Sequence, residues 1–146
     1  MKLFQRMSVL FLTGLLCSCR TDGVFLHEVP GSASDARKAI VSVIGEPKST
    51  SSNGQELVSR YHDKDGQFNE DIKNNKERRF TRITILGDRR PFDLQIEVVI
   101  EKKSIEGGYA FFALDEVLAK EMATKIKKAL NQSLDKRNMI DDFRAF

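Results

Sequence analysis

The chain is poor in the residues that carry most side-chain chemistry. Its 146 residues include two cysteines, two histidines and no tryptophan. Both cysteines, Cys17 and Cys19, fall near the N-terminus, so the rest of the chain has no thiol for catalysis, for a thiolate metal site or for a disulfide. We therefore expect its stability to come from an ordinary packed core.

Motifs of common active sites are also missing. The sequence contains no Gly-x-Ser-x-Gly elbow, no glycine-rich phosphate loop and no His-Glu-x-x-His helix. Asp63 follows His62, but neighbouring residues of a strand point to opposite faces, so we expect a solvated histidine rather than an oriented acid–base pair. We predict a non-enzymatic protein without a cofactor.

Acidic residues gather between Asp63 and Asp71, as the ligands of a calcium site do. In an EF-hand loop glycine is the sixth residue and a glutamate the twelfth. Counted from Asp63, Gly66 is the fourth residue and the twelfth is Asn74. The spacing favours a solvated turn, and we predict no metal site.

The N-terminus combines a basic head, a short apolar run and a small residue before a cysteine. Lys2 and Arg6 precede Met7–Leu16, a run of ten residues that is too short for a membrane span of roughly 20. Ser18 and Cys19 follow. This order is typical of an export signal, and residues 1–19 resemble the lipobox signal peptide of bacterial lipoproteins.

The resemblance implies a lipid anchor on one of the two cysteines. Cys17 follows the bulky Leu16, whereas Cys19 follows the small Ser18, which favours Cys19. By resemblance, cleavage before Cys19 leaves its thiol with a diacylglyceryl group and its amine with an acyl chain such as palmitate. Three chains anchor a protein stably. Arg20 stands where an aspartate retains such proteins in the inner membrane, so we expect the outer membrane, facing the periplasm.

We divide the chain into a signal peptide (1–18), a lipidated tether (19–33) and one domain (34–146). Loss of Lys2 and Arg6 lowers the formal charge from +3 to +1, too little for the field that binds nucleic acid. Residues 20–33 would reach about 45–50 Å when extended. Alternatively, Val24–Leu26 form a short edge strand before Pro30.

The domain is predicted to be α+β. Residues 92–101 alternate apolar and polar side chains, which indicates a strand with one buried face. We expect further strands at 56–62, 80–86 and 109–113, a helix at 35–44 with Ser34 as its N-cap, and a helix from Asp115 to about residue 136. A tail at 139–146 would pack back on the sheet. This order predicts a two-layer sandwich: a three- to four-stranded antiparallel sheet with both helices on one face.

A run of arginines is the best candidate binding site of the domain. These residues are expected to form one basic patch around a hairpin turn, although solvated strand edges are the commoner role of such residues. The leading hypothesis is an accessory module of the envelope that binds a protein or an anionic polymer. The patch comprises Arg78, Arg79, Arg82, Arg89 and Arg90.

A small apolar ligand is the alternative. A groove between the sheet and the helices could hold a lipid or a similar molecule. Such a groove would be lined by Phe80, Phe92, Phe111 or Phe112.

Overall fold

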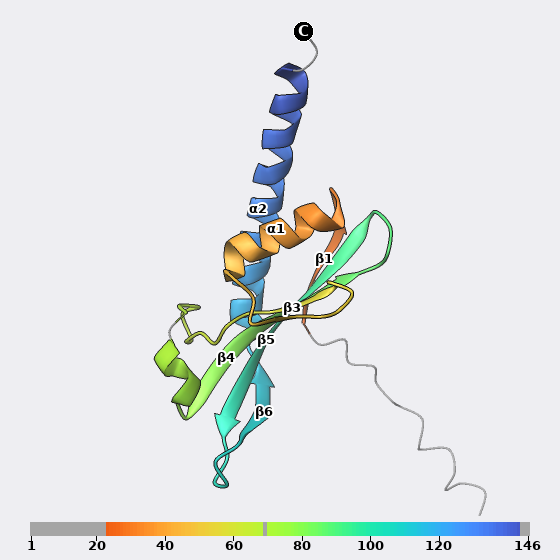
Figure 1. Cartoon of the computed structure of the whole chain (residues 1–146). Coiled ribbons are helices and arrows are strands. Elements are labelled where there is room, and N and C mark those ends of the chain that lie inside the picture. Colours follow the sequence, from red (N-terminus) through yellow and green to blue (C-terminus); the bar gives the residue numbers. More distant parts are fainter. Residues whose placement is uncertain (1–22, 69, 144–146) are drawn as a thin grey trace, which may run out of the picture.

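Two long strands, β4 (Glu77–Leu86) and β5 (Phe92–Lys103), form the centre of the sheet (Figure 1). In this computed structural model, which describes residues 23–68 and 70–143, they pair antiparallel from Glu77 opposite Lys102 to Leu86 opposite Asp93. Their apolar residues alternate as predicted for β5, with Leu94, Ile96 and Val98 fully buried. The alternation therefore gives the sheet one buried face.

Four shorter strands complete an antiparallel sheet of six. β3 (Glu56–Val58) pairs with β4, and β2 (Ser49–Thr50) pairs with β3. On the other side, β1 (Val24–Val29) pairs with the first half of β5 and β6 (Tyr109–Leu114) with the second half. Because β4 occupies one edge of β5, β1 and β6 share the other edge. The α+β class is confirmed, and the sheet has more strands than the three to four predicted.

The N-terminal boundary of the domain lies earlier than predicted. Residues 24–29 belong to the range expected to be a tether, yet they pair with β5 from Val24 opposite Ile96 to Val29 opposite Phe92. Val29 is buried in the core. The alternative of a short edge strand was nearer the structure, and the strand extends to the residue before Pro30.

The first helix, α1 (Ala33–Ile44), begins two residues before its predicted start. Its N-cap is Ser32 rather than Ser34. The Ser32 hydroxyl accepts from the Asp35 amide, and the Asp35 carboxylate accepts from the Ser32 amide, which makes a capping box. Gly45, at φ 71°, ends the helix.

The second helix, α2 (Glu116–Phe143), is longer than predicted. Asp115 caps it by accepting a hydrogen bond from the Leu118 amide at 3.0 Å. The helical backbone continues through the first part of the expected separate tail, and residues 144–146 lie outside the described residues. The second half of α2 extends beyond α1 (Figure 1). Neither described helix has the length and apolar composition of a membrane span.

Both helices cover the same face of the sheet. One cluster of buried side chains joins α1 through Ile40 and Ile44, α2 through Met122 and Ile126, and β4 through Ile83. Burial of each large apolar side chain of this kind contributes about 1.5–3 kcal/mol. Neither α1 nor α2 covers the opposite face. The 3-10 helix η1 (Glu70–Asn74) lies beside one end of it, where the Lys73 carbonyl oxygen accepts from Arg78 and Tyr109. Of the five predicted arginines, Arg78 and Arg82 lie on this face.

Candidate interaction surface

The uncovered side of the sheet, here called the open face, is built from alternate residues of β4 and β5. Thr81, Ile83 and Ile85 point into the core, so the β4 residues between them point to the open face. These side chains are half-buried, which leaves them accessible to a partner. The open face comprises Arg78, Phe80, Arg82 and Thr84 of β4, Gln95, Glu97, Val99 and Glu101 of β5, and the adjoining Tyr61 and Tyr109.

Arg78 is held between two tyrosine rings. Its guanidinium carbon lies 4.1 Å from the ring centroid of Tyr61 and 3.4 Å from that of Tyr109. Its Nε donates to a Glu101 carboxylate oxygen at 2.7 Å. A cation–aromatic contact contributes about 0.5–2 kcal/mol, and the ion pair compensates the charge. Arg78 is therefore a fixed part of the face rather than a free positive charge.

The same stacking continues beyond Arg78. Lys48 Nζ lies 4.3 Å from the Tyr61 ring centroid and donates to the Tyr61 hydroxyl at 2.9 Å. Phe80 packs edge-on against Tyr61, with ring centroids 6.2 Å apart. Tyr109 donates to the carbonyl oxygens of Lys73 and Asn75. We call Lys48, Tyr61, Arg78 and Tyr109 the cation–aromatic strip.

Sequence reasoning missed both tyrosines of this strip. Tyr61 lies outside β3, whose last residue is Val58, and Tyr109 is at the start of β6. Their meeting at Arg78 depends on the pairing of three segments. The available signal was their aromatic character, and no spacing rule connects the two tyrosines to Arg78.

Arg82 lies between two carboxylates of the open face. Its guanidinium is 3.9 Å from Glu56 and 3.6 Å from Glu97. Its Nε is buried without a hydrogen-bond partner, an arrangement that is uncommon in folded proteins. Arg82 is thus electrostatically paired, like Arg78.

Arg79 points to the helix side of the sheet instead. Its Nε donates to Asp115 at 3.3 Å, and its other end pairs with Glu77 at 2.8 Å. Since Asp115 caps α2, Arg79 ties the start of that helix to β4. Its role in the described structure is to hold the fold together.

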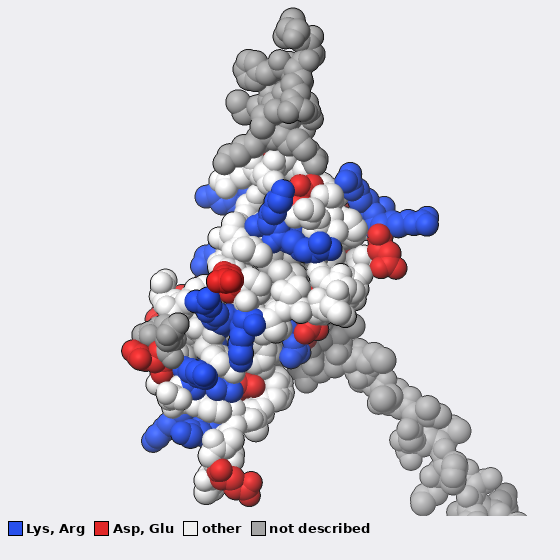
Figure 2. Space-filling view, in the orientation of Figure 1, with Lys and Arg blue, Asp and Glu red and all other residues white. Residues whose placement is uncertain are grey.

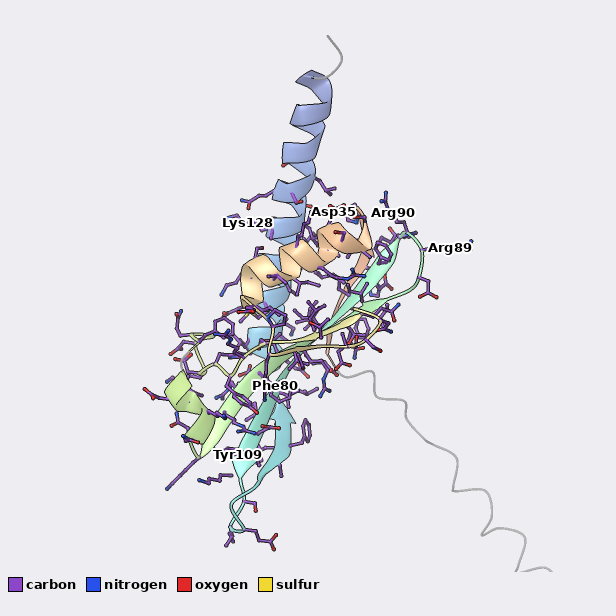
Figure 3. All side chains as sticks on the ribbon, in the orientation of Figure 1. Asp35, Phe80, Arg89, Arg90, Tyr109 and Lys128 are labelled. Atoms are coloured by element: carbon purple, nitrogen blue, oxygen red, sulfur yellow. The ribbon has the colours of Figure 1, made fainter. Side chains whose placement is uncertain are left out.

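The five predicted arginines therefore do not form one patch. Arg89 and Arg90 are exposed at the turn between β4 and β5, far from Phe80 and Tyr109 in Figure 3. Positive and negative side chains alternate over the face seen in Figure 2. Neighbours in the sequence separate because successive strand residues point to opposite faces.

His62 is fully buried, which corrects the prediction of a solvated histidine. The His62 and Arg79 backbones pair, and this pairing draws the residue against β4. Nδ1 faces the Asp63 carbonyl oxygen at 3.0 Å, so it carries the proton, and Nε2 accepts from the Thr81 hydroxyl at 3.0 Å. Burial, with a smaller effect of the Arg79 charge, lowers the pKa of His62. Its neutral ring is part of the structure.

The loop after His62 is organised by Asp63. One carboxylate oxygen of Asp63 accepts from the amides of Asp65 and Gln67, at 2.9 and 2.8 Å. These hydrogen bonds lower the pKa of Asp63. The carboxylate thus shapes a turn, and within residues 23–68 and 70–143 no group of three or more His, Cys, Asp or Glu side chains is placed to hold a metal ion.

The four phenylalanines expected to line an apolar groove lie in three different places. Phe92 is buried in the core, and Phe80 packs on the open face. Phe111 and Phe112 are exposed on β6. The predicted lining therefore does not assemble.

The lipidation site belongs to the part of the chain that the structure leaves out. Residues 1–18 and Cys19 lie outside the described residues, so the anchor stays a prediction. No protein-family model matches the chain, and no curated protein matches it either.

Proposed function

We propose that the chain is a non-enzymatic lipoprotein of the cell envelope, anchored through Cys19 and facing the periplasm from the outer membrane. Its domain serves as an accessory module that binds an envelope protein on the open face. The observation that carries the binding role is the cation–aromatic strip on the sheet face that α1 and α2 leave uncovered.

The chemistry of the buried polar groups favours binding over catalysis. Both ring nitrogens of His62 are engaged in hydrogen bonds within the fold. Arg79 and Asp115 are engaged with each other at the start of α2. A general base needs a nitrogen or carboxylate that can reach a substrate, and these groups support the fold instead.

The charge balance of the open face favours a protein over an anionic polymer. Glu101 neutralises Arg78, and Glu97 lies beside Arg82. An anionic polymer needs uncompensated positive charge, whereas tyrosine and arginine at half-exposed positions are enriched where proteins meet. A face whose arginines are paired with carboxylates and stacked on aromatic rings fits a protein surface.

The anchor is tested by metabolic labelling with a radioactive fatty acid. We expect the wild-type chain to carry the label and to sediment with membranes, and Cys19→Ala to lose both properties. Cys17→Ala is the matched control, because that residue would leave with the signal peptide, and it should keep the label. Label on Cys19→Ala would show that the cleavage site is wrong.

The binding face is tested by adding bulk to it. Thr84 is half-buried on the open face, opposite Glu56 of β3. Thr84→Arg adds a long side chain whose positive charge lies beside the carboxylate of Glu56. Recovery of a cross-linked partner from envelopes should fall about tenfold, the loss expected when a contact worth about 1.4 kcal/mol is removed from the open face.

Thr124→Arg makes the same substitution on the exposed side of α2 and should leave recovery unchanged. Circular dichroism of both variants confirms that they fold. Equal recovery with the two variants would contradict binding at the open face.

A further inference from the structure

The spacer between the proposed anchor and the sheet is short. Since β1 begins at Val24, only residues 20–23 separate Cys19 from the first paired residue. Fully extended at about 3.3–3.6 Å per residue, they reach about 13–14 Å. If Cys19 carries the lipid, as proposed above, the bilayer surface lies close to the start of β1.

The start of β1 lies on the same edge of β5 as β6. Val24 is opposite Ile96, and Leu114, the last residue of β6, is opposite Val99 of that strand. Three residues along a strand correspond to about 10 Å. The nearer end of β6 therefore lies within the length of the spacer from Val24.

This part of the chain concentrates exposed apolar side chains. Of the seven large hydrophobic residues exposed in the described structure, four fall within residues 105–117. Phe111 and Phe112 are 66% and 56% exposed. The other two of the four are Ile105 and Val117.

The two phenylalanines project on opposite sides of β6. Phe111 is opposite Glu101 on the open face, where Arg78 pairs with that carboxylate. Phe112 lies under Lys102, whose Nζ is 3.4 Å from the ring centroid. An aromatic ring on each side of a strand suits a surface that meets the strand edge-on.

We propose that the β6 edge rests on the bilayer that holds the anchor, with Phe111 and Phe112 at the level of the lipid headgroups. Aromatic side chains concentrate at that level, and the ammonium group of the exposed Lys103 can reach lipid phosphates. In the part of the chain that the structure describes, β6 pairs only with β5. Its outer backbone groups must keep water as a partner, so the contact is shallow.

Tryptophan fluorescence tests this contact directly, because the natural chain has no tryptophan. The full chain with Phe112→Trp is produced in bacteria with a radioactive fatty acid, purified in its labelled form, and reconstituted in phosphatidylethanolamine–phosphatidylglycerol vesicles. The vesicles carry a quencher on the lipid chain, either near the headgroup or near the chain end. We expect blue-shifted emission and stronger quenching by the shallow quencher.

Val41→Trp is the matched control. Val41 is an exposed apolar residue of α1, and α1 leads through Gly45 to β2, the edge strand farthest from β1 and β6. Its tryptophan should emit as in water and remain unquenched. Equal quenching at the two positions in labelled protein would overturn the contact and leave the anchor intact.

Two further outcomes also contradict the proposal. Absence of label would overturn the anchor and, with it, this inference. If labelled protein shows no quenching and Phe112→Glu lowers the sedimenting mass in detergent, the edge pairs with a second copy or another chain instead of the bilayer.

Discussion

The imidazole of His62 is enclosed by groups that leave it no access to water. The Thr81 hydroxyl and the Asp63 carbonyl occupy its two nitrogens, and the Phe68 ring packs edge-on with centroids 5.7 Å apart. The positive charge of Arg79 also opposes protonation of the ring. A second proton on this ring would displace the Thr81 hydrogen bond.

We predict that His62 makes the domain sensitive to mild acid. Its pKa is lowered from 6.5 in the folded state, so the unfolded chain binds more protons below about pH 6.5. The free energy of unfolding should therefore be level above that pH and fall as the pH decreases below about 6.5. Urea unfolding followed by circular dichroism measures this change.

His62→Gln provides the control, because glutamine offers a donor and an acceptor but does not titrate. This variant should lose most of the pH dependence in that range. Asp63 and Asp93, whose pKa values are lowered from 3.8, contribute only in stronger acid. A wild-type slope that His62→Gln preserves would assign the effect to another group.

Two adjacent arginines show why the sequence did not predict the partners of the basic residues. Arg78 and Arg79 are adjacent, yet one stacks on Tyr61 and the other reaches Asp115. Alternation along a strand separates them, and the prediction grouped them by their position in the chain. The residue types were visible in the sequence, whereas their partners required the pairing of distant segments.

At the scale of elements, the strands with a clear alternation were the predictable ones. β5 was predicted from residue 92, where it begins, and the alternation that defines it continues to the end of the buried face. β1 mixes apolar Val24 and Leu26 with polar His27 and Glu28, and its register shifts between Leu26 and Val29. Such a strand is stabilised by pairing with β5 rather than by its own pattern.

The start of α1 was predictable in principle. Ser32 and Asp35 have the spacing of a capping box, in which an acidic or amide residue stands three positions after the cap. For Ser34, that third position is Arg37, which cannot accept from a backbone amide. The choice between the two serines thus depends on the residue three positions later.

For the whole molecule, the main correction concerns where the domain begins. β1 contributes Val29 to the core, and Val24 and Leu26 pack against it. The predicted boundary at residue 34 would remove this strand and also Ser32, the cap of α1. A buried valine alone contributes about 1.5–3 kcal/mol.

We therefore predict that a chain beginning at residue 34 is less stable than one beginning at residue 23 by at least about 3 kcal/mol. The longer chain keeps every described element and serves as the control. Urea unfolding of both chains, monitored by circular dichroism, gives the difference. Equal urea midpoints and equal slopes for the two chains would show that β1 is dispensable and that the domain boundary predicted at residue 34 was adequate.

The position of β1 in the sheet also orders the events of biosynthesis. Val24 is among the first residues of the domain to be made, and its partner Ile96 follows only after β2, β3 and β4. Contacts between such distant residues form late in folding. β1 thus remains without its pairing strand until residue 96 has emerged, so the processing proposed at Cys19 can precede the pairing of β1.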